Sequence, residues 1–200
     1  RKLNKKSLDA LCRAGALGSL IDDRFTGEKH FWIACCQDRP KNLKKLSENI
    51  EAYKEAGSFS LNDKVEFITE LTGIFPMSLV LTEEVKTRLE KRFVPPISEF
   101  DYDLGVCWAI PRSVNARKSK NGKWFFVVDL IDSNNVITKI RCWGVQPDDV
   151  KKQTGFYKAN PDSVEPAIYL NRPYVIKPKY SDGWGFSTYG KINNLWGLLA

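Results

Sequence analysis

The sequence predicts an α+β protein whose first half is helical and whose second half is a small β-barrel. Apolar residues recur every three or four positions through the first half, which is the period of a helix buried on one face. From Tyr102 onward, short runs of β-branched and aromatic residues alternate with turn residues, as strands do. Pro95-Pro96 forbids a helix between the two patterns. We therefore expect a helical region over 1–94, a linker over 95–101 and a strand domain over 102–200.

The excess positive charge of the chain lies entirely in its second half. The 200 residues carry 31 Lys and Arg against 24 Asp and Glu. Residues 1–103 contain 17 of each sign, which leaves 14 basic and 7 acidic residues for 104–200. We therefore expect the strand domain to face a polyanion, with a merely solvated basic surface as the alternative.

Capping and breaking residues delimit the expected helices. Asn4 can cap a helix over Lys5–Arg13, and Gly15 ends that helix before a second short turn. Glycines and prolines bound the remaining segments. These are expected at 16–21, 27–37, 41–56, 62–71 and 81–92.

The expected strands lie at 104–111, 123–131, 136–143, 174–179 and 184–189. Between the first two, 112–120 is expected to be a long basic loop that closes on the tight turn Asn121-Gly122. A long excursion over 144–165 separates the third strand from the fourth. Five strands with such an excursion form the layout of the OB fold, a partly open Greek-key barrel. The sequence thus predicts a five-stranded OB-type β-barrel.

The third expected strand alternates between two faces. Val136, Thr138, Ile140 and Cys142 share one face, and Ile137, Lys139, Arg141 and Trp143 share the other. Cations beside a tryptophan suit single-stranded nucleic acid, because cations meet phosphates and an aromatic ring stacks on a base. In OB barrels, the outer face of strands two and three and the loops beside it form the usual binding surface.

The loops beside that face supply further candidates. On the alternative interpretation, Trp143 and Trp184 cap the ends of the barrel and the lysines keep its edges soluble. The second strand is apolar nearly throughout, so the sequence leaves open which of Trp124, Phe125 and Phe126 faces outward. The predicted nucleic-acid contacts of the barrel are Arg117, Lys118, Lys120, Lys123, Lys139, Arg141, Trp143, Trp184 and Phe186.

A second candidate contact lies near the N-terminus. A short helix, a hairpin at Gly15 and a second helix can direct backbone N–H groups at a phosphate. Lys5, Lys6 and Arg13 would add positive charge nearby. A glycine between two short helices is also an ordinary turn.

Nothing in the sequence indicates catalysis, a metal or a cofactor. The five cysteines form no CxxC pair, and the only histidine, His30, is more typical of a helix surface or a core than of a general base. No zinc site can be assembled, and no phosphate-loop, nucleophile-elbow or zincin motif occurs. We interpret the cysteines as reduced thiols of a cytoplasmic protein, and we expect no membrane partner because no apolar run is long enough. The first residue is Arg1 rather than Met, so we expect a piece of a longer protein.

Three stretches resemble, in order, segments of one family. Residues 6–20 are similar to a helix-hairpin-helix stretch, and 70–76 resembles the segment that follows it, without its His-Pro. Residues 122–132 resemble the pattern Gly-Lys-x-x-Phe-Val-x-Leu-x-Asp, with one extra residue before Asp132. This order is similar to the C-terminal region of the DNA polymerase III alpha subunit family, the bacterial-type replicative polymerases.

The resemblance implies a non-catalytic DNA-binding region of a replicative polymerase, a nucleotidyltransferase of bacterial or phage type. The hairpin would contact the duplex backbone and the OB barrel would hold the single-stranded template, while the catalytic aspartates would lie upstream. Residues 153–157 are similar to sliding-clamp-binding peptides, so a sliding clamp or another replisome subunit is a candidate partner. Two other functions stay open: a free-standing OB module for single-stranded DNA or RNA, and a protein-interaction scaffold in replication.

Overall fold

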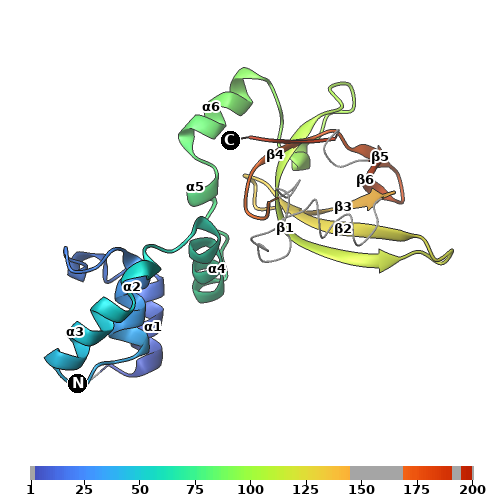
Figure 1. The fold of residues 1–200 in the computed structure, drawn as a ribbon. Helices are drawn as coiled ribbons and strands as arrows, with labels where there is room; N and C mark the ends of the chain where they lie inside the picture. The colour runs from blue at the N-terminus through green and yellow to red at the C-terminus, as the bar shows by residue number, and fades with distance from the viewer. Residues whose placement is uncertain (1–2, 145–168, 191–194, 200) are drawn as a thin grey trace. The chain divides into compact units, whose positions relative to one another are not determined.

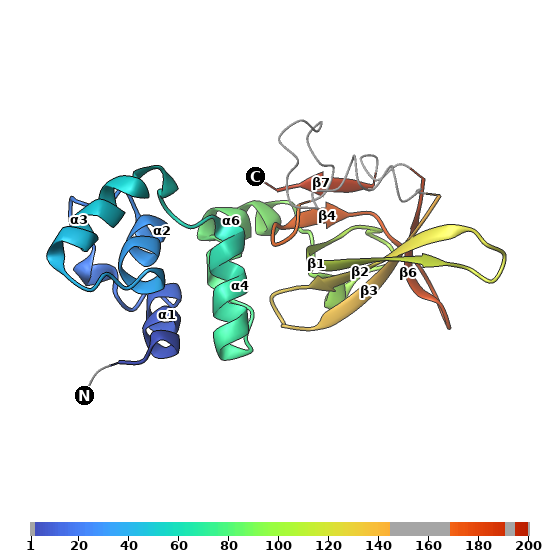
Figure 2. The ribbon, with the colours of Figure 1, turned by 60° about the horizontal axis from the view of Figure 1, so that its bottom comes forward.

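The computed structural model describes residues 3–144, 169–190 and 195–199 (Figures 1 and 2). The chain divides into two compact units, Arg1–Pro76 and Met77–Ala200. Every described strand lies in the second unit, and helices occur in both, so the protein is α+β as predicted. Within the described residues, no helix is both long and apolar enough to cross a membrane.

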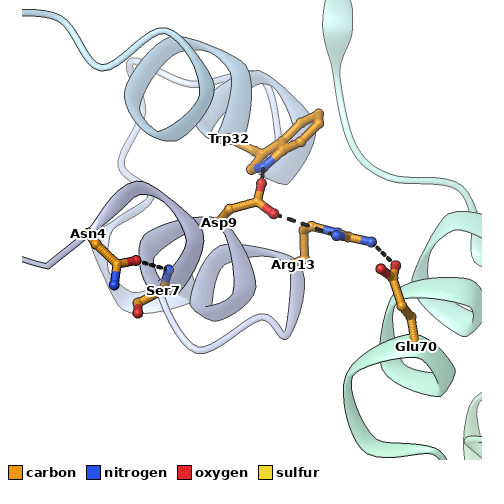
Figure 3. Close-up of polar contacts among 6 residues, drawn as sticks. All are labelled: Asn4, Ser7, Asp9, Arg13, Trp32 and Glu70. Atoms are coloured by element: carbon orange, nitrogen blue, oxygen red, sulfur yellow. Dashed lines mark hydrogen bonds and ion pairs between the residues drawn. The ribbon is translucent and has the colours of Figure 1, made fainter.

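The first unit begins with α1 (Lys5–Arg13), which has the bounds that the sequence predicts. The Asn4 side chain accepts a hydrogen bond from the N–H of Ser7 at 2.7 Å, as an N-cap residue does (Figure 3). The helix ends before Gly15, whose φ of +77° is left-handed. Only the 3₁₀ turn η1 (Gly18–Leu20) follows, so the second helix of the expected hairpin is a single short turn.

Further elements follow α1 in the first unit, and the small apolar core of this unit contains Cys12, Phe25, Phe31 and Cys36. The predicted helix over 27–37 is divided into an α-helix and a π-helix, and the helix predicted over 41–56 finishes in a 3₁₀ turn. These elements are α2 (Glu28–Phe31), η2 (Trp32–Gln37), α3 (Leu43–Ala52), η3 (Lys54–Ala56) and α4 (Leu61–Thr72).

His30 is a fully buried part of this unit. Its Nδ1 accepts a hydrogen bond from the N–H of Thr26 at 3.0 Å. The proton therefore lies on Nε2, which donates to the carbonyl of Ile50 at 2.8 Å. Both ring nitrogens therefore form hydrogen bonds to other segments of the unit, so His30 is a core histidine. This is one of the two roles that the sequence favoured over that of a general base.

The second unit starts with two short helices, α5 (Met77–Val80) and α6 (Glu83–Lys91). The predicted linker over 95–101 is instead packed against the sheet. The Pro95 carbonyl accepts from the N–H of Trp108 at 2.9 Å, and Ile97, in η4 (Ile97–Glu99), is only 1% exposed. A proline has no N–H to donate, but its carbonyl can still accept a hydrogen bond from a neighbouring strand.

Within the described residues, seven strands form one mixed sheet in the order β5-β6-β3-β2-β1-β4-β7. The sheet is curled (Figures 1 and 2). The pairs are antiparallel except for β3 and β6, which run parallel. The bent strand β1 pairs with β4 near its start and with β2 along the rest of its length. The strands are β1 (Cys107–Lys118), β2 (Trp124–Ile131), β3 (Ile137–Trp143), β4 (Tyr174–Ile176), β5 (Lys179–Ser181), β6 (Gly185–Tyr189) and β7 (Trp196–Leu198).

Three features of the sheet differ from the prediction. Residues 112–118 continue β1 rather than forming a loop, because their backbone pairs with β2 as far as Trp124. Figure 2 shows the resulting hairpin extending beyond the other strands. The expected fourth strand is divided into β4 and β5 on either side of Lys177-Pro178, since proline has no N–H to donate. The three-residue strand β7, beside β4, was not predicted.

The concave side of the sheet encloses the core of the second unit. Ile140 and Cys142 of β3 are buried there, which confirms the inward face of the predicted alternation. Val136, assigned to that face, precedes β3 and is exposed, and Thr138 is half-buried. Of the predicted excursion over 144–165, only Gly144 is within the described residues, and the clamp-like peptide at 153–157 is outside them.

Candidate nucleic-acid interface

One row of side chains crosses four strands on the outer face of the sheet. The register places Arg117 opposite Phe125, Phe125 opposite Trp143, and Trp143 beside Tyr189. Directly paired residues project to the same side of a sheet, so the row consists of one cation followed by three aromatic rings.

The three rings of this row lie nearly parallel. The centroids of Phe125 and Trp143 are 4.4 Å apart with an interplanar angle of 21°. The Trp143 and Tyr189 centroids are 6.4 Å apart at 16°. We call these three rings the aromatic ladder. Tyr189, at its β6 end, is 61% exposed, so a flat apolar ligand can reach the ladder.

The next row along the strands contains Arg141, which lies between Val127 and Ser187. Its Nη1 donates to the backbone carbonyl of Trp184, in the turn that leads into β6. A guanidinium has five N–H groups, so four others can serve a phosphate. The indole of Trp184 is 69% exposed. Arg141 thus holds the turn that carries this indole.

A third row contains the ion pair of Lys139 and Asp129, whose Nζ and Oδ1 atoms are 3.9 Å apart. The other carboxylate oxygen of Asp129 accepts from the Ser113 hydroxyl at 2.6 Å. Lys139 therefore lies on the predicted face, with an acidic neighbour that reduces its availability to a phosphate.

The turn between β1 and β2 adds further cations. Lys120 and Lys123 are exposed there, and the Lys118 Nζ lies 4.8 Å from the centroid of the Trp124 ring. Two grooves, of about 670 and 520 Å³, run beside Trp143. Lys123 and Trp124 line the first, and Lys118 and Lys120 line the second. Each groove therefore combines aromatic walls with lysines.

The structure brings most of the predicted barrel residues together but separates Phe186 from them. Phe186 lies opposite the buried Ile140 and so projects to the inner face. Its ring packs 5.4 Å from that of Phe100 and 4.9 Å from that of Tyr180. Trp184, in the turn, stays on the outer side, where it lines the groove of about 520 Å³ together with Arg141 and Trp143. The predicted residues that gather there are Arg117, Lys118, Lys120, Lys123, Arg141, Trp143 and Trp184, with Lys139 on the same face.

Two residues of the ladder were not among the predicted contacts. Phe125 shares its face with Asp129, four positions later, and the charge of Asp129 is a signal that this face is the outer one. Phe126 lies in the core and Trp124 is half-buried near the end of the sheet, which answers the question that the sequence left open. Tyr189 joins the ladder only through the parallel pairing of β3 with β6, for which the sequence carries no local signal.

In the first unit, the backbone amides of the hairpin are used within it. The N–H of Gly15 donates to the Cys12 carbonyl and that of Ala16 to the Leu11 carbonyl, which is the Schellman arrangement at a helix end. The N–H of Gly18 donates to the carbonyl of Gly15. These three N–H groups therefore already donate to carbonyls within the turn and are not available to a phosphate in this conformation.

The Arg13 guanidinium is also engaged within the first unit (Figure 3). It bridges Asp9, at 3.5 Å, and Glu70 of α4. Asp9 in turn accepts from the indole N–H of Trp32 at 2.6 Å. This network joins three helical elements, so Arg13 is a packing residue. Of the predicted cations near the hairpin, Lys5 and Lys6 are exposed.

Among residues 3–144, 169–190 and 195–199, no three His, Cys, Asp or Glu side chains gather as a metal ligand set. No protein-family model matches the chain, and no curated protein sequence matches it.

Proposed function

We propose that the curled sheet of the second unit is a variant of the OB-type barrel predicted over 102–200, and that it holds single-stranded nucleic acid. The spatial order β4-β1-β2-β3 supports the fold, because a fourth strand returning beside the first defines a Greek key. β4 and β5 are separated by two residues and pair with β1 and β6, which lie on opposite sides of β2 and β3 in the sheet. On this proposal they are the two halves of one OB strand that spans the barrel, and β7 is an addition.

The observation that carries the binding proposal is the aromatic ladder on the outer face of β2, β3 and β6. Unpaired bases expose flat apolar surfaces, and stacking on an aromatic side chain contributes about 1–3 kcal/mol per base. Bases in a duplex are already stacked on one another, so a ladder on an open sheet favours single strands. The ladder lies on the outer face of strands two and three, which OB barrels use for oligonucleotides.

The cations beside the ladder support a ligand with a phosphate backbone. Arg117 occupies the same row as Phe125, and Arg141 the next row. Lys120 and Lys123 are exposed in the adjoining turn. Each phosphate that they neutralise releases counterions, so the affinity should fall steeply as salt is raised.

We further propose that the chain is the DNA-binding, non-catalytic region of a replicative polymerase of the DNA polymerase III alpha type. The support is the order of the similar segments: α1 with its glycine turn, then the Greek-key sheet whose β1–β2 turn and β2 carry the Gly122–Asp132 pattern. The hairpin has weaker support as a duplex contact, because the amides of Gly15, Ala16 and Gly18 bond within the turn. On this proposal the duplex contact rests on the exposed Lys5 and Lys6.

Fluorescence anisotropy with a labelled oligothymidylate of about 16 nucleotides tests the barrel. Tyr189 is the exposed end of the ladder, so we expect Tyr189→Ala to weaken binding by about 5- to 100-fold, which is the loss of one stacked base. The matched control is Phe93→Ala, which removes another exposed aromatic ring of the same unit, away from the ladder. Wild-type protein that binds no oligonucleotide at low salt would exclude the proposal and favour the interaction scaffold.

A second titration separates the polymerase region from a free-standing OB module. A polymerase region should also bind duplex DNA, and Lys5→Ala with Lys6→Ala should weaken duplex binding while single-strand binding is retained. Lys44→Ala with Lys45→Ala is the charge control, because these lysines are exposed on α3 of the same unit. Single-strand binding without duplex binding would support the free-standing module, and a labelled RNA of the same length would show whether RNA is preferred.

A further inference from the structure

A separate groove, of about 680 Å³, lies in the second unit between α6 and the segment that leads into β1. Its lining includes the buried side chains of Leu81, Leu89 and Trp108. The exposed side chains of Phe93 and Leu104 also line it. None of these residues belongs to the aromatic ladder or to its cations. The groove is therefore an apolar surface that the nucleic-acid proposal does not use.

Phe93 has an unusual backbone for such a residue. It follows α6 with a φ of +51°, and its N–H donates to the Glu90 carbonyl while that of Val94 donates to the Leu89 carbonyl. This is the Schellman arrangement, in which the left-handed position is usually glycine. A phenylalanine with this backbone conformation is strained. Because 82% of Phe93 is exposed, contacts within the chain do not compensate for the strain. A ligand that covered the ring would supply the missing burial.

Most of the charged side chains that line this groove are negative. Glu90, Glu99 and Asp101 line it with exposed carboxylates. The lining contains one cation, Lys86, whose Nζ is already 2.5 Å from a carboxylate oxygen of Glu83. A positively charged ligand is therefore favoured at the rim, and a nucleic acid is repelled.

We propose that this groove docks a segment of a partner protein that carries large apolar side chains flanked by Lys or Arg. The apolar side chains would cover Phe93 and Leu104, and the basic residues would face the three carboxylates. Exposed aromatic residues beside an apolar pocket are the usual anchors of protein interfaces. A second copy of the chain fits less well, because a two-fold contact through this face would bring like charges together. The proposal does not depend on the nucleic-acid function.

The test is selection of a random peptide library displayed on phage against the immobilised full chain. Counter-selection uses the variant Phe93→Gly. We expect the enriched peptides to combine aromatic or large aliphatic residues with a net positive charge. A synthetic copy of one such peptide should bind wild-type protein at least tenfold more tightly than it binds Phe93→Gly.

The stability of Phe93→Gly provides an independent readout. Glycine relieves the left-handed strain, so the midpoint of thermal unfolding should not fall, and a loss of peptide binding then reflects the missing ring. The control Leu198→Ala removes an exposed apolar side chain of β7, which is not part of the groove, and should leave peptide binding unchanged. Oligonucleotide binding should be the same in both variants as in wild type.

Three results would overturn the proposal. The first is a selection that yields no peptide dependent on Phe93. The second is enrichment of acidic rather than basic peptides, which would contradict the charge complementarity. The third is self-association of the chain that is lost in Phe93→Gly, as measured by sedimentation velocity, which would assign the groove to a second copy.

Discussion

Asp129 is an acidic residue in the middle of the cationic outer face. Its carboxylate accepts from the Ser113 hydroxyl and lies 3.9 Å from the Nζ of Lys139. The Oδ1 atom is buried and has no hydrogen-bond partner among the residues that the structure describes. Asp129 therefore holds Lys139 near the sheet, and its charge opposes that of an approaching phosphate.

Replacing Asp129 by Asn is expected to strengthen oligonucleotide binding. The substitution keeps the shape and the Ser113 contact but removes the charge that competes for Lys139. Because a partly exposed ion pair is worth about 0.2–1 kcal/mol, we expect a gain of up to about fivefold in affinity. Since Lys139 would then meet a phosphate, the slope of log affinity against log salt should steepen by about 0.7. Anisotropy titrations at several salt concentrations measure both quantities.

The matched control for this prediction is Lys139→Ala in the Asp129→Asn background. It should abolish both the gain in affinity and the steeper salt dependence. Unchanged or weaker binding by Asp129→Asn alone would show that Lys139 does not reach the nucleic acid.

At the scale of an element, the end of α1 shows how one residue can have two interpretations. Gly15 was predicted as a phosphate contact in a hairpin, and the structure places it at the left-handed position of a Schellman motif. The backbone N–H of Gly15, which was expected to bind a phosphate, instead donates to the carbonyl of Cys12. Ending the helix is therefore a sufficient physical reason for a glycine at this position.

Gly15→Ala is expected to lower the free energy of unfolding by about 1–2 kcal/mol, the cost of a left-handed conformation for an L-residue. No atom lies within 4 Å of an added Cβ, so the cost is conformational rather than steric. Urea unfolding followed by circular dichroism measures it. The control is Gly18→Ala, where a Cβ also meets nothing but φ is not left-handed, so its effect should be small. If Gly15→Ala instead kept full stability and lost duplex binding, Gly15 would be assigned to the phosphate contact.

At the scale of the whole molecule, buried thiol and phenol groups make the stability of the folded state depend on pH in the alkaline range. Burial raises the pKa of Cys107 to about 12 and that of Cys142 to about 11, from an ordinary value of 9.0. Burial also raises the pKa of Tyr174 to about 12, from 10.0. All three side chains belong to the core of the second unit.

The unfolding temperature of this unit is therefore expected to fall as pH rises. The unfolded chain loses these protons from about pH 9, whereas the folded chain keeps them until about pH 11–12, so unfolding becomes more favourable over this interval. Thermal unfolding followed by near-ultraviolet circular dichroism at pH 7–11 measures the effect. Cys142→Ala should flatten the dependence on pH, whatever its effect on stability at neutral pH. An unfolding temperature that rose between pH 9 and 11 would contradict this coupling.

The amino-acid sequence by itself determined the features that depend on neighbours along the chain. The bounds of α1 follow from Asn4 and Gly15, and the turn between β1 and β2 from Asn121-Gly122. The outward face of β3 carries Lys139, Arg141 and Trp143. It follows from the alternation of inward and outward residues, which is typical of a strand that is buried on one face. Each of these signals is local, because a cap, a turn or a strand face is decided within a few residues.

The tertiary structure alone decided which strands meet, and thereby the composition of the candidate site. The parallel pairing of β3 with β6 brings Tyr189 to the ladder and turns Phe186 into the core. It joins segments more than forty positions apart in the sequence, and its register depends on packing rather than on propensity. The continuation of β1 through 112–118 likewise needed a partner strand to hydrogen-bond a segment whose composition predicts a loop. Long-range pairing of this kind is a property of the folded sheet, so no pattern in a single segment could have indicated it.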